Sequence, residues 1–144
     1  MAVIVISGEA LVKRKFKNLK LNNLHAIVAL ARKRLDTKVF YDLAETIQMT
    51  EKNLAEIIHL STRTISNYRD QKKTIEPLYS EHLLKLILLF EKGEELFGTI
   101  EEFNYWLKKP FWNSKEIPMD WIVTPGGVDL LLEEMERLAQ GYTV

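Results

Sequence analysis

The chain has 144 residues, of which 47% are hydrophobic and 28% charged, with no cysteine and a formal net charge of zero. This length suffices for one sizeable core, or for two small cores that share a connecting helix. No stretch approaches the roughly 20 apolar residues of a membrane span, and the apolar run at residues 2–6 is too short for a signal peptide. Without cysteine there is no disulfide scaffold and no thiolate metal site, so we expect a cytoplasmic protein.

The net charge of zero conceals two halves of opposite sign. Residues 1–75 contain 14 Lys and Arg against 7 Asp and Glu, whereas residues 76–144 contain 6 against 13. A basic half favours contact with a nucleic-acid backbone, because neutralised phosphates release counterions, and an acidic half is repelled from it. The pattern predicts different partners for the two halves, unless the charges simply balance within one fold.

Residues 1–21 are interpreted as an N-terminal leader or arm. The apolar run at residues 2–6 favours either a short strand that pairs with a symmetry mate or a disordered leader. Four basic residues follow it: Lys13, Arg14, Lys15 and Lys17.

Helical periodicity of apolar residues begins near residue 22. A first helix is predicted from a cap at Asn22 or Asn23, and a second from about Thr37 with Asp36 or Thr37 as its cap. Thr50 and Ser61 can cap two further short helices. The predicted inward-facing residues of the four helices are Leu24, Ile27, Val28, Leu30 and Ala31; Val39, Phe40, Leu43, Ala44 and Ile47; Leu54, Ile57 and Ile58; and Ile65 and Tyr68.

The two short helices in residues 51–70 fit the helix-turn-helix frame, in which the first helix braces the second for entry into a major groove. The frame requires a small residue where the helices cross, which is Ala55 here. The turn position is usually glycine and is His59 here, a residue that tolerates positive φ better than most. The frame's apolar positions are occupied by Leu54, Ile58, Leu60, Ile65 and Tyr68. The alternative is a helical hairpin with a solvated polar face.

The outward face of the second of these helices, with the residues after it, is rich in donors suited to phosphates and base edges. Three residues are predicted to reach the bases of operator DNA: Arg63, Thr64 and Asn67. Five are predicted to hold the DNA backbone: Ser61, Thr62, Arg69, Lys72 and Lys73. Ser66 lies on the same face and completes the predicted DNA-binding set.

After a turn near Glu76 and Pro77, a long apolar helix is predicted from Ser80 to about residue 97, buried on all sides. Thr99 with Glu102 forms a capping box for another helix, which Pro110 stops. Residues 111–123 are predicted to form a loop, and Thr124 with Pro125 a last helix closed by Gly141.

The expected fold class is all-α. A helix-turn-helix domain over residues 22–98 is joined by the long helix to a small helical domain over residues 99–144. A homodimer is expected, because helix-turn-helix proteins usually read two half-sites and the long helix carries more apolar surface than one core needs. Which surface pairs the two copies stays open.

The second half also carries a specific order of residues: Glu95-Leu96-Phe97-Gly98, Phe103, Trp106-Leu107, Pro110, Pro118-Met119-Asp120, Thr124, Gly126 or Gly127, Arg137-Leu138 and Gly141-Tyr142. In this order it resembles the toxin-binding domain of the antitoxins of RES-type toxin systems, the Xre/MbcA/ParS-like family. The resemblance extends from about Leu24 onward. The chain departs from the family's usual asparagine and glycine pair at residues 111–113 and 115–116.

The resemblance implies an Xre-like DNA-binding half, a C-terminal half that sequesters a RES-domain toxin, and repression of the shared operon. Toxins of this family act on NAD or transfer ADP-ribose. That chemistry belongs to the toxin, so the implied role of this chain is inhibition by binding, without a cofactor of its own. The implied partners are a RES-domain toxin and operator DNA.

Aromatic residues of the second half are anchors of the kind used at protein interfaces. We predict core positions for Phe103 and Trp106, and leave Phe111, Trp112 and Tyr142 open between core and interface. The residues after the last helix are predicted to project toward a toxin's active-site cleft, with fraying in solution as the alternative. The predicted toxin-binding set is Phe111, Trp112, Arg137, Gly141, Tyr142, Thr143 and Val144.

No catalytic or metal site is predicted, and we expect that the chain is not an enzyme. His25, His59 and His82 show no metal-binding spacing, and Gly93 with Gly98 lacks the Lys-Ser/Thr of a phosphate loop. The carboxylates come in runs typical of helix surfaces. The alternative function is a stand-alone helix-turn-helix regulator whose C-terminal half only dimerises or senses a ligand.

Overall fold

The computed structural model describes residues 10–141, and the apolar run at residues 2–6 lies outside the described residues. The fold over this range is all-α, as predicted, with one isolated antiparallel β-bridge between Leu35 and Ile75. The elements are α1 (Leu11–Lys15), η2 (Lys17–Leu19), α2 (Leu24–Arg32), α3 (Thr37–Thr46), α4 (Glu51–Ile58), α5 (Thr62–Asp70), α6 (Pro77–Phe97), α7 (Ile100–Leu107), η3 (Pro118–Val123) and α8 (Pro125–Ala139), where η marks a 3-10 helix.

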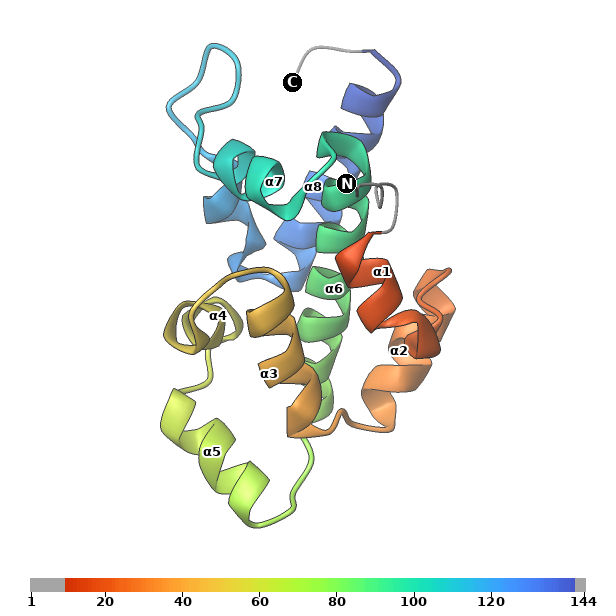
Figure 1. Ribbon diagram of the computed structural model, residues 1–144, viewed down its shortest axis with the longest axis vertical. Helices are drawn as coiled ribbons and strands as arrows, with labels where there is room; N and C mark the ends of the chain where they lie inside the picture. The colour runs from red at the N-terminus through yellow and green to blue at the C-terminus, as the bar shows by residue number, and fades with distance from the viewer. Residues whose placement is uncertain (1–9, 142–144) are drawn as a thin grey trace, which may run out of the picture.

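Helix α6 is the central element of the molecule (Figure 1), and it contacts α1, α2, α4, α7 and α8. It begins at Pro77, three residues before the predicted start, because proline at the first helical position loses no hydrogen bond. Its middle is buried all round, as predicted, since the exposed fraction is at most 1% for Leu83, Leu84, Leu86, Ile87, Leu89 and Phe90. None of the helices described over residues 10–141 is long and apolar enough to cross a bilayer.

Six helices begin at a side-chain cap that the sequence predicts. The capping oxygen accepts a hydrogen bond from a backbone N–H two or three residues ahead, which satisfies a group that the helix itself leaves unpaired. The caps are Asn23, Asp36, Thr50, Ser61, Thr99 and Thr124. At the two positions where the sequence left a choice, the cap is therefore Asn23 and Asp36.

Ser80 has a different role from the predicted one, because α6 is already helical at this position. Its hydroxyl donates to the carbonyl of Ile75 at 2.8 Å and accepts from the backbone N–H of Leu35 at 3.1 Å. The Ile75 N–H donates in turn to the Leu35 carbonyl at 2.8 Å. Ser80 thus joins the α2–α3 connection to the α5–α6 connection.

The segment predicted as a leader contains a helix that packs on the central core. Val12 is fully buried on α1, and Phe16 is 8% exposed. The buried carboxylate of Glu94 on α6 accepts from the backbone N–H groups of Leu11 at 2.9 Å and Val12 at 3.0 Å. Residues 11–16 are therefore packed on the core beside α6 and do not form a free arm, while the predicted domain boundary at residue 21 stays a prediction.

Two residues of α2 do not face inward as the periodicity predicts. Leu24 is 61% exposed and Val28 is 40% exposed, whereas Ile27 and Ala31 are buried against α6. Helix α2 lies at the margin of the bundle (Figure 1), so only one narrow stripe of it is covered.

The C-terminal half packs around Phe103 on α7, which is fully buried. Its ring meets Phe90 edge-on at 5.1 Å between centroids. Gly93 on α6 permits this approach, because a Cβ there would overlap the Phe103 ring. Part of the predicted loop 111–123 is instead the 3-10 helix η3, whose Ile122 is fully buried against the core.

Candidate nucleic-acid interface and aromatic loop

Helices α4 and α5 have the helix-turn-helix geometry that the sequence predicts. The apolar frame residues are covered, with Leu54 1%, Ile58 1% and Ile65 0% exposed, and Ala55 at the crossing is 2% exposed. Leu60 and Tyr68 are partly buried. His59 ends α4 in the left-handed conformation, with φ 66° and ψ 32°, as the frame requires of its turn residue.

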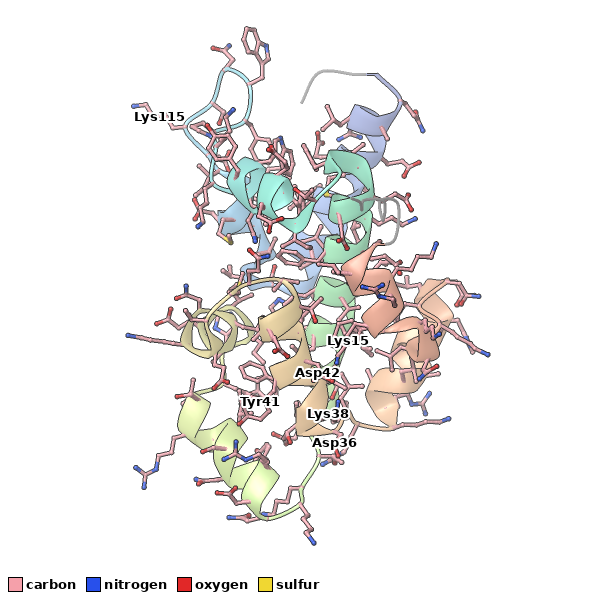
Figure 2. The ribbon with its side chains drawn as sticks, viewed as in Figure 1. Lys15, Asp36, Lys38, Tyr41, Asp42 and Lys115 are labelled. Atoms are coloured by element: carbon pink, nitrogen blue, oxygen red, sulfur yellow. The ribbon has the colours of Figure 1, made fainter. Side chains whose placement is uncertain are left out.

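Helix α5 lies at one end of the molecule (Figure 1), where it packs mainly against α3 and α4. Tyr41 of α3 lies between α3 and α5 (Figure 2), and the Arg69 guanidinium lies 5.3 Å from the centre of its ring. Partial burial raises the pKa of the Tyr41 hydroxyl; the Arg69 charge opposes this shift, and the charges of Glu51 and Asp70 add to it. The neutral ring face therefore accepts the cation and holds the end of α5 against α3.

Of the three residues predicted to reach the bases, two have side chains that are exposed to solvent and not engaged in hydrogen bonds within the described residues. Arg63 and Asn67 are exposed, and within residues 10–141 neither side chain has a hydrogen-bond partner. The Thr64 hydroxyl is half-buried and accepts from the Ser61 hydroxyl at 2.9 Å. Arg63 and Asn67 are thus the side chains best placed to meet base edges, because their donors need not first be released.

The six other residues of the predicted DNA-binding set also divide into two groups. Thr62, Lys72 and Lys73 are exposed around the two ends of α5. Ser61 is used as a cap, Ser66 donates to the Arg63 carbonyl at 3.0 Å, and Arg69 pairs with Asp70 at 3.2 Å. This second group shapes and anchors α5, and its predicted contacts with DNA stay predictions.

The loop of residues 108–117, which connects α7 to η3, lies at the other end of the molecule (Figure 1). It is rich in aromatic and basic residues. Phe111 is half-buried, with its ring 4.6 Å from Trp121 and 6.1 Å from Trp106. Glu116 closes the loop, because its carboxylate accepts from the Trp121 indole at 3.1 Å and its carbonyl accepts from the Phe111 N–H at 2.9 Å.

Trp112, next in the chain, is 74% exposed and thus differs sharply from Phe111. Tyr105 on α7 is 63% exposed, and the Lys109 ammonium lies 4.8 Å from its ring centre. Lys115 extends from the loop into solvent (Figure 2). The sequence prediction missed Tyr105 and these lysines, although Lys108, Lys109 and Lys115 make this loop basic within an acidic half.

Two further residues of the predicted toxin-binding set, Arg137 and Gly141, lie in the last turn of α8 and just after it, and this end of α8 is on the same side of the molecule as the loop (Figure 1). Arg137 is exposed and pairs with Glu134 one turn earlier on its own helix. Gly141 has φ 95° just after α8, the left-handed geometry that a C-terminal glycine provides. Tyr142, Thr143 and Val144 lie outside the described residues.

Polar contacts join the two ends through the middle of the molecule. Asn104 of α7 donates to the Ile47 carbonyl at 2.9 Å, and buried Lys85 of α6 pairs with Asp129 of α8 at 2.8 Å. Burial lowers the pKa of Lys85, but its hydrogen bonds and charge contacts with Asp129 and Glu81 together outweigh burial and raise it overall. His82 of α6 is 3% exposed and its Nε2 donates to the Ile122 carbonyl at 2.8 Å.

His82 predicts a stability that depends on pH. Burial lowers its pKa below the ordinary value of 6.5, more than the Ile122 hydrogen bond raises it. The unfolded chain therefore binds the proton more readily, so the free energy of unfolding should fall as the pH decreases through about 6.5. Urea unfolding between about pH 8 and pH 5.5 measures this dependence. His82→Gln should flatten it, exposed His25→Gln should not, and an unchanged slope in His82→Gln would refute the assignment.

Comparison with known proteins assigns the region that contains α4 and α5. Residues 26–87 match the family model described as the antitoxin Xre-like helix-turn-helix domain. No curated protein sequence gives a significant match to the chain. The matched region, which has an Xre-like helix-turn-helix fold, runs from α2 into the first half of α6.

Proposed function

We propose that the chain is an antitoxin that represses its own operon through α5 and neutralises a RES-domain toxin through its C-terminal half. The observation that carries the proposal is the separation of two surfaces. An antitoxin-type recognition helix lies at one end, with Arg63 and Asn67 unpaired within residues 10–141. An exposed tryptophan, Trp112, lies on the loop at the other end (Figure 1). One molecule can thus bind DNA and a protein at the same time.

The exposed aromatic side chains support a protein partner for the second surface. Trp112 lies on a loop that Phe111 anchors to the core, and Tyr105 lies on the neighbouring helix α7; both side chains are large and largely uncovered. Tryptophan and tyrosine are the residues most often found at the energetic centre of interfaces. Because charges across an interface are usually complementary, the lysines of the loop indicate that the toxin should present carboxylates to it. The resemblance of residues 95–142 to the toxin-binding domain supports the RES class of partner.

The second candidate is a stand-alone regulator whose C-terminal half dimerises or senses a ligand. The observation that favours it is Leu130 on α8, an apolar side chain that is 45% exposed and that a second copy could cover. The two candidates differ in whether a RES-domain protein binds at all.

Co-purification distinguishes the two candidates. The untagged full-length chain is produced together with a tagged RES-domain protein encoded beside it, and the tagged protein is captured. Stoichiometric recovery of the untagged chain supports the antitoxin. If none is recovered while the chain still binds its promoter DNA, the stand-alone regulator is the better account.

Arg63→Ala should weaken binding to promoter DNA by about 1 to 3 kcal/mol, because a base-reading guanidinium makes two hydrogen bonds that alanine cannot make. Fluorescence anisotropy with a duplex from the promoter of its own gene measures the loss. Lys115→Ala, at the opposite end, is the matched control and should bind DNA like the original chain. Equal affinities of the two variants would show that Arg63 does not read DNA.

A further inference from the structure

We propose that His59 is a positioning residue for DNA binding, because its imidazole fastens the helix-turn-helix turn to the C-terminal half and so sets the orientation of α5. The inference rests on the proposed DNA-binding role of α5. It goes beyond that role, because the affinity of α5 for DNA would then depend on the position of η3, which belongs to the C-terminal half.

The contact joins residues that are far apart in the chain. His59 Nε2 donates to the carbonyl of Val123, the last residue of η3, at 2.8 Å, across 64 residues of sequence. The preceding carbonyl, that of Ile122, accepts from His82 at 2.8 Å. The centroids of the two rings lie 6.5 Å apart, and the ring planes are inclined by 30° to each other. Two consecutive carbonyls of η3 therefore each accept a hydrogen bond from an imidazole. One imidazole, His82, belongs to the core helix α6, and the other, His59, belongs to the turn before α5.

The position of α5 depends on its packing against two helices and on the turn that links it to α4. Helix α5 packs on α3 and α4, and His59 with Leu60 and Ser61 connects it to α4. A cleft of about 460 Å³ opens between α4 and η3, lined in part by Ile57, Met119 and Val123. Beyond this cleft, just after α4, the exposed His59 ring is hydrogen-bonded to η3, in addition to the packing contacts between α4 and η3.

The tie also explains why histidine stands where the helix-turn-helix frame usually has glycine. The position has φ 66°, a left-handed conformation that disfavours any residue with a Cβ. Glycine would adopt it without strain but could not reach Val123. The hydrogen bond to Val123 offsets the strain, so histidine at this turn adds a connection that glycine would not provide.

The coupling between the two sites must act in both directions, because a coupling free energy is reciprocal. DNA bound to α5 should change the surroundings of η3, and a protein that displaces η3 should change the affinity for DNA. On this inference, the hydrogen bond between His59 and Val123 is the link through which a displacement of η3 would reach α5.

The test uses His59→Gly, which removes the imidazole and leaves a residue that suits the backbone of the turn. The full-length chain is titrated with a mixed-sequence DNA duplex of about 20 base pairs at low salt, where binding needs no operator sequence. NMR signals of Ile122, Val123 and Thr124 are followed during the titration. In the original chain these signals should shift as DNA binds, and in His59→Gly they should not, while DNA affinity falls about three- to tenfold. Exposed His25→Ala is the control and should behave like the original chain.

The outcomes separate this inference from the proposed function. If the original chain does not bind the duplex, both are overturned. If it binds, but His59→Gly has the same affinity and the same shifts at η3, the positioning role alone is overturned. His59→Asn also tolerates positive φ but lacks the imidazole, so it provides a second variant with the same expected loss.

Discussion

Gly127→Ala should destabilise the protein by about 3 kcal/mol, at the upper end of the usual cost of overpacking. A Cβ on Gly127 would overlap the backbone carbonyl oxygen of Trp121, which no side-chain rotation can relieve. The Gly127 N–H also donates to the Thr124 hydroxyl at 3.0 Å. Helix α8 therefore cannot shift to make room without losing its cap.

Gly126→Ala is the matched control for this prediction. A Cβ on Gly126 meets nothing within 4 Å, although the residue is the neighbour of Gly127 in the same first turn. Alanine in a helix is favoured over glycine, so this variant should be neutral or more stable by up to about 1 kcal/mol. Urea denaturation of both variants measures the difference. Similar midpoints for the two variants would contradict the described packing of Trp121 on α8.

Trp112→Ala should weaken toxin binding by at least about 2 kcal/mol, or roughly 30-fold, if this side chain is the anchor of the proposed interface. The stability of the free chain should hardly change, because the side chain is 74% exposed. Calorimetric titration of the RES-domain protein gives the affinity, and thermal unfolding gives the stability.

Leu78→Ala provides the control for a general loss of surface hydrophobicity. Leu78 is 68% exposed at the start of α6, at the end of the molecule that holds α5 (Figure 1). The Leu78→Ala variant should bind the toxin with the same affinity as the original chain. Equal toxin affinities for Trp112→Ala and the original chain would place the interface elsewhere than on this loop.

The helices of this fold could be predicted from the sequence because their signals are local. A cap such as Thr99 contacts a backbone group only three residues ahead, and the apolar stripe of a helix repeats within one turn. The packing of α1 could not be predicted, because the carboxylate of Glu94 that receives its first N–H groups lies more than 80 residues away. The exposure of Leu24 was missed because periodicity identifies an apolar face but not whether another element covers it.

The candidate sites show the same limit. The helix-turn-helix frame could be predicted because its spacing is fixed, and His59 takes the left-handed conformation expected of the turn. Phe111 and Trp112 could not be told apart, since a loop has no periodicity to show which ring turns inward. The contact of His59 with Val123 has no sequence signal, because it depends on how η3 packs against α4.

Growth rescue tests the central claim most directly. Cells that produce the RES-domain protein encoded beside this chain should stop growing, and production of the chain from a separate promoter should restore growth. Arg63→Ala should restore it equally, because neutralisation by binding does not need DNA. A chain that binds its own promoter DNA but leaves the cells arrested would contradict the antitoxin role and favour a stand-alone regulator.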